Sequence, residues 1–381
     1  MTGPVQVDGV FELPALDATN PLGFLAALGT LVTVHAAGAR GARLRFRRGA
    51  TWIPTIEGMA ADSQEAFSEL IASGLTGKAV AEQAEKERAQ AQRAFDVAKK
   101  ACEDKKKEIK KRGLKGKDRT RVLNEELSPF EHAREQERSA WLVALEAAVP
   151  RPELALGKRI DCTPDEYRAH AQRFCVGANC AERETLDLLA AFGSDARRAE
   201  RSDAIEPTPF CFITGSGHQY FLDTVRQLME LVAPTRVRQS LFEPWTYRDE
   251  GLSMRWDPID DRRYALMDRD PGPLGSKTIW MANLLAYRAL VLFPCAARRF
   301  ELDVTGWTDH NQEATFTWPI WEFAAPLDTV RSLLQLAELR DEHPDRELLR
   351  ARGIAEALRV RRIKVGAGAN YKLNFTQARS I

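Results

Sequence analysis

Three aspartates lie close together in the chain and could support metal chemistry. Asp257, Asp260 and Asp261 carry carboxylates, the oxygen ligands with which nucleases hold divalent cations. A proline stands among them, and Arg262 and Arg263 follow at once, so a turn held by ion pairs explains the same residues equally well. A metal-dependent nuclease is therefore one function that the sequence leaves open.

Other catalytic patterns are incomplete. Thr214 and His218 stand around Ser216 where a nucleophile elbow needs glycine, and Ser276 precedes Lys277 where a phosphate loop needs glycine. The six cysteines form no C-x-x-C pair, which argues against a structural zinc site. We therefore expect no catalytic residues, no bound metal, no cofactor and no enzymatic activity.

A concentration of positive charge is the feature that most favours binding. Twelve Lys or Arg and four acidic residues lie between Lys99 and Arg121, a local charge of +8, whereas the chain totals +1 and the remainder therefore −7. Lysines and arginines bind nucleic acid by displacing the counterions of phosphates. The segment has no aromatic residue to stack on bases, so docking to an acidic protein surface and simple solubility stay open. The candidate nucleic-acid-binding residues here are Lys105, Lys106, Lys107, Lys110, Lys111, Arg112, Lys115 and Lys117.

Two long helices must position these cations. Residues 78–112 contain no proline or glycine and are rich in Ala, Glu, Lys, Gln and Arg, the composition of a solvent-facing helix. Gly113 and Gly116 end that pattern, and a second helix is expected over 118–148, with a kink or a restart at Pro129. The short glycine-containing turn predicts an antiparallel helical hairpin resembling a coiled coil.

The rest of the chain mixes helices and strands without a regular βαβ repeat, which predicts an α+β body interrupted by this hairpin. Asn20 and Pro21 begin an apolar helix as N-cap and first residue. Residues 42–47 alternate as a strand beside 51–56, with arginines on one face that suit either phosphate or an exposed sheet edge. The expected division is 1–75 and 210–381 as parts of the body, 76–150 as the hairpin, and 151–209 as a helical segment and linker.

Length and composition narrow the class of protein. A chain of 381 residues can bury a large core, and its balanced charge is unlike that of a histone or an acidic tail. No secretory leader and no apolar run of about 18 residues is evident, so we expect no membrane association and a cytoplasmic location.

Several segments together resemble a known family. These are Asn20-Pro21-Leu22-Gly23-Phe24, Phe212-Ile213-Thr214-Gly215, Arg255-Trp256-Asp257-Pro258, Asp261-Arg262-Arg263-Tyr264, Ala282-Asn283-Leu284-Leu285-Ala286, Phe316-Thr317-Trp318-Pro319-Ile320-Trp321 and Arg361-Arg362-Ile363. Their order resembles that of type I-G (formerly I-U) CRISPR-associated proteins of the large-subunit-like, helicase-nuclease-extension group. The chain departs from that pattern at Ser216 and in the hairpin, for which we know no family requirement.

This resemblance implies a subunit that binds rather than cuts. Its partners would be CRISPR effector subunits together with crRNA, target DNA or both, because base pairing reads the sequence in such complexes while protein subunits hold the backbones. An interaction protein that uses the hairpin without touching nucleic acid is the alternative. The candidate contacts in the body are Arg262, Arg263, Arg361, Arg362, Lys364, Tyr371 and Lys372, for which intramolecular ion pairs are the other interpretation.

Overall fold

The chain divides into two compact units. The computed structural model describes residues 9–175, 179–200, 202–213, 219–259, 277–299, 301–310, 313–365 and 372–381. Residues Lys78–Gly157 form one unit, here called the hairpin unit, and Met1–Gly77 with Lys158–Ile381 form the other, here called the body. The hairpin unit therefore ends later than the predicted segment 76–150.

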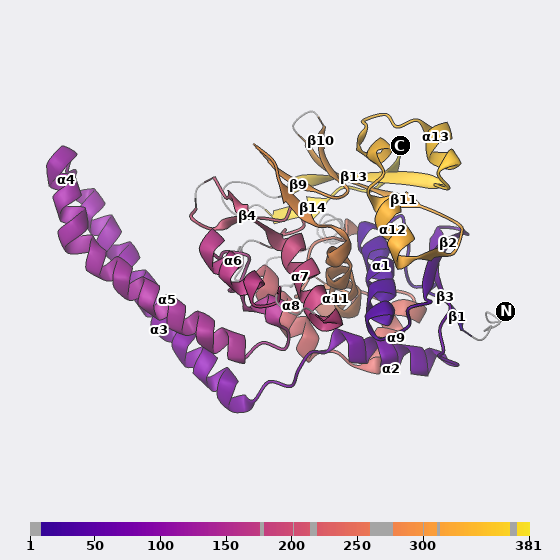
Figure 1. Cartoon of the computed structure of the whole chain (residues 1–381), viewed down its shortest axis with the longest axis horizontal. Coiled ribbons are helices and arrows are strands. Elements are labelled where there is room, and N and C mark those ends of the chain that lie inside the picture. Colours follow the sequence, from indigo (N-terminus) through magenta and orange to yellow (C-terminus); the bar gives the residue numbers. More distant parts are fainter. Residues whose placement is uncertain are drawn as a thin grey trace, which may run out of the picture. The chain divides into compact units, whose positions relative to one another are not determined.

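The body combines helices with several small sheets, which confirms the α+β class (Figure 1). One sheet has the order β1-β3-β2-β12 and another has β10-β11-β13-β14, with β15 also paired to β13. The strands of these two sheets are β1 Val10–Glu12, β2 Arg43–Arg48, β3 Trp52–Glu57, β10 Trp307–His310, β11 Glu313–Ile320, β12 Ala325–Pro326, β13 Glu356–Val365, β14 Lys372–Phe375 and β15 Arg379–Ser380. Three two-stranded pairs complete the described strands: β4 Gly193–Arg198 with β5 Ile205–Pro207, β6 Asp249–Glu250 with β7 Lys277–Thr278, and β8 Cys295–Ala297 with β9 Leu302–Val304.

The described residues of the body also form helices. They are α1 Pro21–Ala36, α2 Gln64–Leu75, α6 Pro164–Gln172, α7 Cys180–Phe192, α8 Phe221–Glu230, α9 Pro234–Phe242, α11 Trp280–Arg288 with its 3-10 extension η4 Ala289–Leu292, α12 Leu327–Leu334, η5 Ala337–Arg340 and α13 Arg346–Ala351.

Helix α1 lies in the core of the body, as its apolar sequence predicted. The Asn20 side chain accepts a hydrogen bond from the backbone N–H of Leu22, which satisfies one donor of the first turn, and Pro21 follows the cap. Residues 21–34 are all buried. Helix α11 packs so closely that a Cβ added at Gly29 would lie 1.7 Å from the carbonyl oxygen of Leu285. Glycine is therefore required where the two helices meet.

Tryptophans tie distant segments into this core. Trp318 Nε1 donates to the carbonyl of Ala18 at 3.0 Å, and the Trp318 ring stacks on Phe24 with centroids 5.7 Å apart. Trp256 Nε1 likewise donates to the carbonyl of Phe210 at 3.0 Å. The segments that carry the family resemblance thus include residues that build the core of the body.

The arginines of β2 are used within their own sheet. Arg45 pairs with Glu57 on β3, and Arg47 pairs with Glu12 on β1 at 2.5 Å. Strand β2 lies between β3 and β12, so it is not the sheet edge that its alternating arginines suggested. Cross-strand ion pairs account for Arg45 and Arg47.

The hairpin unit has its own helices. They are α3 Glu82–Lys111, α4 Gly116–Val122, the π-helical turn η1 Leu123–Leu127, α5 Ser128–Ala147 and the 3-10 turn η2 Pro152–Ala155. Helices α3 and α5 lie side by side and run in opposite directions (Figure 1). The Lys78 backbone N–H donates to the Pro150 carbonyl at 2.9 Å and joins the segment before α3 to the segment after α5.

Aromatic and aliphatic contacts hold α3 to α5. Phe95 stacks on Trp141 with ring centroids 5.3 Å apart and an angle of 8° between the rings. Nearer the turn, Cys102, Ile109 and Leu127 form a buried cluster. Pro129 stands in the first turn of α5, which begins at Ser128 directly after the π-helical turn η1, so of the two expected outcomes, a kink or a restart, the structure has the restart.

Candidate nucleic-acid interface

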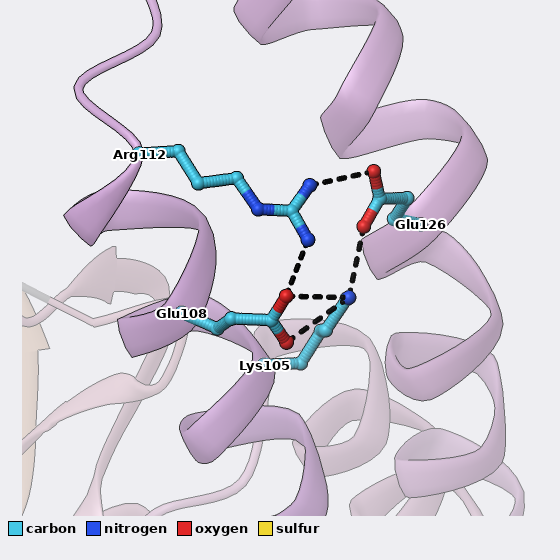
Figure 2. Close-up of polar contacts among 4 residues, drawn as sticks. All are labelled: Lys105, Glu108, Arg112 and Glu126. Carbon is cyan, nitrogen blue, oxygen red and sulfur yellow. Dashed lines mark hydrogen bonds and ion pairs between the residues drawn. The ribbon is translucent and has the colours of Figure 1, made fainter.

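The predicted cations of the hairpin unit occupy the end of α3, the turn after it and the start of α4, but they differ in what they contact. Lys105 and Arg112 belong to an ion-pair network with two glutamates (Figure 2). Glu126 accepts from Lys105 Nζ at 2.8 Å and from Arg112 Nη1 at 2.8 Å, while Glu108 on α3 also contacts both cations. This network joins α3 to η1.

The network changes the acidity of its members. Hydrogen bonds from Arg112 and then Lys105 lower the pKa of Glu126 to about 2, and the same donors lower the pKa of Glu108. The hydrogen bond to Glu126 is the main cause of the raised pKa of Lys105. Lys105 and Arg112 thus serve first as contacts between helices.

Two further candidates are paired as well. Lys106 Nζ lies 2.8 Å from Glu131 of α5, and Lys107 Nζ lies 3.4 Å from Asp104 one turn earlier. Both pairs are exposed, and such pairs contribute about 0–1 kcal/mol. Lys106 and Lys107 can therefore exchange their partners for phosphate at small cost.

The remaining candidates are exposed and unpaired. Lys110, Lys111, Lys115 and Lys117 make no ion pair within the described part of the chain. Two arginines of α4 share this property and were not among the predicted contacts, although the basic run to Arg121 contained the signal for them. The unpaired end of the hairpin unit therefore comprises Lys110, Lys111, Lys115, Lys117, Arg119 and Arg121.

A hollow of about 460 Å³ opens among these residues. Ile109, Leu123 and Leu127 contribute apolar surface, whereas Lys110 and Arg119 contribute charge. It lies wholly within the hairpin unit. The surface at this end of the unit therefore contains apolar side chains next to unpaired cations.

The candidate residues of the body have varied surroundings. Arg361 Nη1 contacts both carboxylate oxygens of Glu313, at 2.8 and 3.0 Å, which is an intramolecular ion pair. Arg362 lies over the Trp307 ring at 5.5 Å and donates to the Pro209 carbonyl at 3.2 Å. These two arginines therefore have structural partners.

Lys364 and Lys372 are exposed on the paired strands β13 and β14. In the register, Val365 stands opposite Lys372 and Lys364 opposite Leu373. Because side chains alternate between faces along a strand, the two lysines lie on opposite faces of this strand pair. The other candidates, Arg262, Arg263 and Tyr371, lie outside the described residues.

Asp257 has a structural role that the metal-site hypothesis did not anticipate. Its side chain is 1% exposed. Oδ1 accepts from Asn20 Nδ2 and from the Ile259 backbone N–H, each at 2.9 Å, and Oδ2 accepts from the Tyr247 hydroxyl at 2.9 Å. Both carboxylate oxygens accept hydrogen bonds from protein donors. We therefore interpret Asp257 as a buried residue that holds the surrounding segments together rather than as a metal ligand.

The described residues contain no group of three or more His, Cys, Asp and Glu side chains that could hold a metal ion. Asp260 and Asp261, the other members of the proposed cluster, lie outside those residues. Among the described helices none combines the length and the apolar character that crossing a bilayer demands.

No protein-family model matches this chain, and no curated protein matches it either.

Proposed function

We propose that the chain is a non-catalytic subunit of a type I-G CRISPR RNA-guided interference complex. Its partners would be the other effector subunits together with crRNA, target DNA or both. The observation that carries the proposal is the set of six exposed, unpaired cations at the end of the hairpin unit. The order of the segments that resemble the family supports the wider assignment to the complex.

The geometry of the turn suits contact with a phosphate backbone. Gly113 and Gly116 have positive φ values of 63° and 56°, which allow the chain to reverse between α3 and α4. The reversal brings cations from the last turn of α3 and from α4 to one end of the unit. Unpaired ammonium groups can contact phosphates without first losing an ion pair within the protein. The free energy gained by releasing the counterions of the phosphates is therefore reduced little by the loss of protein contacts.

Residues of the body would add contacts. Lys364 and Lys372 are exposed and stay in the proposal, together with Arg262, Arg263 and Tyr371. Contact by Arg361 would break its pair with Glu313, and contact by Arg362 would break its contacts with Trp307 and Pro209. Such a protein would work in the cytoplasm, where an RNA-guided complex meets invading DNA.

The test is binding of the full chain to single- and double-stranded RNA and DNA as salt is raised. The test variant carries Lys110→Gln, Lys111→Gln, Lys115→Gln and Lys117→Gln. Each phosphate contact on a single strand adds about 0.7 to the slope of log K against log salt, so the variant should lower that slope by up to about 3.

A matched control removes the same charge from the earlier part of α3 and its approach, outside the basic segment: Lys78→Gln, Lys86→Gln, Arg88→Gln and Arg93→Gln. This control should bind nearly as the unmodified chain does. Equal loss in both variants would mean that total charge matters and the turn does not, and no binding by the unmodified chain would refute nucleic-acid contact by the isolated protein. Copurification with sequencing of bound RNA then tests membership in the complex.

The hollow at the end of the hairpin unit favours one other candidate function, docking of a protein partner. Its half-buried residues Leu114 and Leu123 offer nothing to phosphate but would bury further surface against apolar side chains, whereas Ile109 and Leu127 are already buried. An interaction factor of this kind would lose its partner when Leu123 is changed to Asp, while its salt-dependent binding of nucleic acid, if present, would persist.

A further inference from the structure

A second surface, in the body, combines aromatic rings with unpaired arginines. A hollow of about 200 Å³ lies between α9, the loop after it and the start of α11. Its lining includes Arg236 from α9, Trp245 and Arg248 from the loop, and Trp280 from α11. The basic end of the hairpin unit has arginines but no aromatic rings, so it lacks this combination.

The pair formed by Arg236 and Trp280 is closer, and its tryptophan is more exposed, than in the other arginine–tryptophan pairs of the described chain. The Arg236 guanidinium lies 4.8 Å from the Trp280 ring centroid. Arg48 over Trp52 and Arg362 over Trp307 are longer, at 5.7 and 5.5 Å, and their rings are only 5% and 6% exposed. Trp280 is half-buried, so part of its surface remains open beside the arginine.

Hydrogen bonds fix both tryptophans. Trp245 Nε1 donates to the Ser240 carbonyl at 2.9 Å, and Trp280 Nε1 donates to the Gly251 carbonyl at 3.4 Å. The backbone N–H of Trp280 donates to Asp249 Oδ2 at 2.8 Å. Because the indole N–H groups are occupied by protein acceptors, the rings are oriented before any ligand binds.

The loop that shapes the hollow is strained. Tyr247, Leu252 and Arg255 have φ values of 51°, 52° and 63°, and they are the non-glycine residues with positive φ in the described part of the chain. Bulky residues adopt this conformation only where the surroundings impose it, and such residues cluster at ligand-binding sites. Tyr247 is held by its hydroxyl bond to Asp257, which leaves its neighbours Thr246 and Arg248 exposed.

The two arginines of the hollow can contact an anionic ligand. Arg236 and Arg248 are exposed and have no ion pair within the described residues. The two carboxylates of the hollow are engaged elsewhere: Glu243 pairs with Arg238 at 2.5 Å, and Asp249 accepts from the Trp280 backbone. The guanidinium groups are thus available to a phosphate.

We propose that this hollow binds one nucleobase of a single-stranded nucleic acid, stacked among Trp245, Trp280 and Arg236, while Arg248 meets an adjacent phosphate. The volume is below the ~300–1,000 Å³ of pockets for drug-sized ligands, which suits a single ring system rather than a whole cofactor. Aromatic rings and arginines that stack on bases are the usual means of holding a single strand without reading its sequence. The inference rests on the proposed function, since the hairpin unit would hold the same class of ligand.

The experiment compares a thymidine oligonucleotide of about 20 nucleotides with an abasic strand of equal length, using the full chain. Base stacking should make the thymidine strand bind about 5- to 100-fold tighter and should quench tryptophan fluorescence. Trp280→Leu and Arg236→Gln should each reduce this preference toward one. Arg48→Gln, which removes an arginine from a buried tryptophan, is the matched control and should retain it.

The exposed substitution Arg248→Gln keeps the test valid if Trp280→Leu fails to fold, and it should weaken binding of the thymidine strand. Equal affinity for the two strands, or a preference that survives both Arg236→Gln and Trp280→Leu in folded protein, would overturn the proposal. Free dTMP that competes as well as the strand would assign the hollow to a mononucleotide and likewise overturn it. The four lysine changes in the hairpin unit should lower the salt slope but keep the thymidine preference, so the two proposals fail separately.

Discussion

Asn20 Nδ2 donates to Asp257 Oδ1 at 2.9 Å and joins two residues 237 positions apart. Asn20 uses its other side-chain atom, Oδ1, to cap α1. Asp257 uses its other oxygen to hold Tyr247 in the loop beside the Trp245 and Trp280 hollow. One contact therefore connects the cap of the central helix with the strained loop.

Changing Asp257 to Ala should destabilise the body. The substitution leaves the half-buried amide of Asn20 and the buried hydroxyl of Tyr247 without their acceptor, at a cost of roughly 2–4 kcal/mol in the free energy of unfolding. Denaturant unfolding followed by tryptophan fluorescence measures it. A metal ligand would behave differently: if Mg²⁺ or Mn²⁺ raised the stability of the unmodified chain but not of the variant, the structural assignment of Asp257 would be wrong.

The network around Glu126 should make the hairpin unit sensitive to acid. Because the pKa of Glu126 is held near 2, below its ordinary 4.5, the carboxylate stabilises the folded unit fully above about pH 4.5. This contribution is lost as the pH falls from about 4.5 to 2. Glu126→Gln should flatten the loss between those values in thermal melts. Glu125→Gln, beside it and without an ion pair in the described chain, is the control and should melt as the unmodified protein does at each pH.

The Phe95 and Trp141 stack should dominate the packing of α3 on α5. Trp141 is 2% exposed, and truncation of a buried tryptophan to alanine costs about 3–5 kcal/mol. Trp141→Phe keeps an aromatic ring and removes an indole N–H that has no hydrogen-bond partner, so it should cost much less. Hydrogen exchange of α3 and α5 amides measures both effects. Phe130→Ala on the same helix, where the ring is 38% exposed, should change exchange little.

The same substitution should cost much more stability at one arginine of β13 than at another. Arg359 is 1% exposed and donates to Thr317 Oγ1 and to the carbonyls of Leu339, Asp341 and Glu342. Arg359→Gln should cost roughly 2–4 kcal/mol because those acceptors lose a charged donor.

Arg361→Gln is the matched change two residues further along, where the exposed pair with Glu313 should contribute less than about 1 kcal/mol. The midpoints of urea unfolding, measured for both variants and the unmodified chain, compare the stability that each substitution removes. Similar midpoints would mean that the buried hydrogen bonds of Arg359 contribute little.

The sequence predicted those parts of the fold that depend on interactions between residues close together in the chain. The Asn20 cap, the apolar helix after it and the glycine-containing turn of the hairpin each depend on neighbours a few residues away. The paired state of Lys105 and Arg112 depends on Glu126, which lies across the turn, and a count of lysines cannot reveal it. The burial of Asp257 depends on Asn20, and the hollow depends on α9 meeting α11, so neither follows from spacing.

The hydrogen bond between Lys78 and Pro150 has a consequence for how this chain can vary. Since Lys78 and Pro150 meet just outside α3 and α5, the two helices can gain or lose matching whole turns while these two residues keep their contact. The lengths of α3 and α5 can therefore change without a change in the fold of the segments that precede and follow them. Duplication or deletion of paired helical turns would in this way change the distance within the hairpin unit between its basic end and the contact of Lys78 with Pro150.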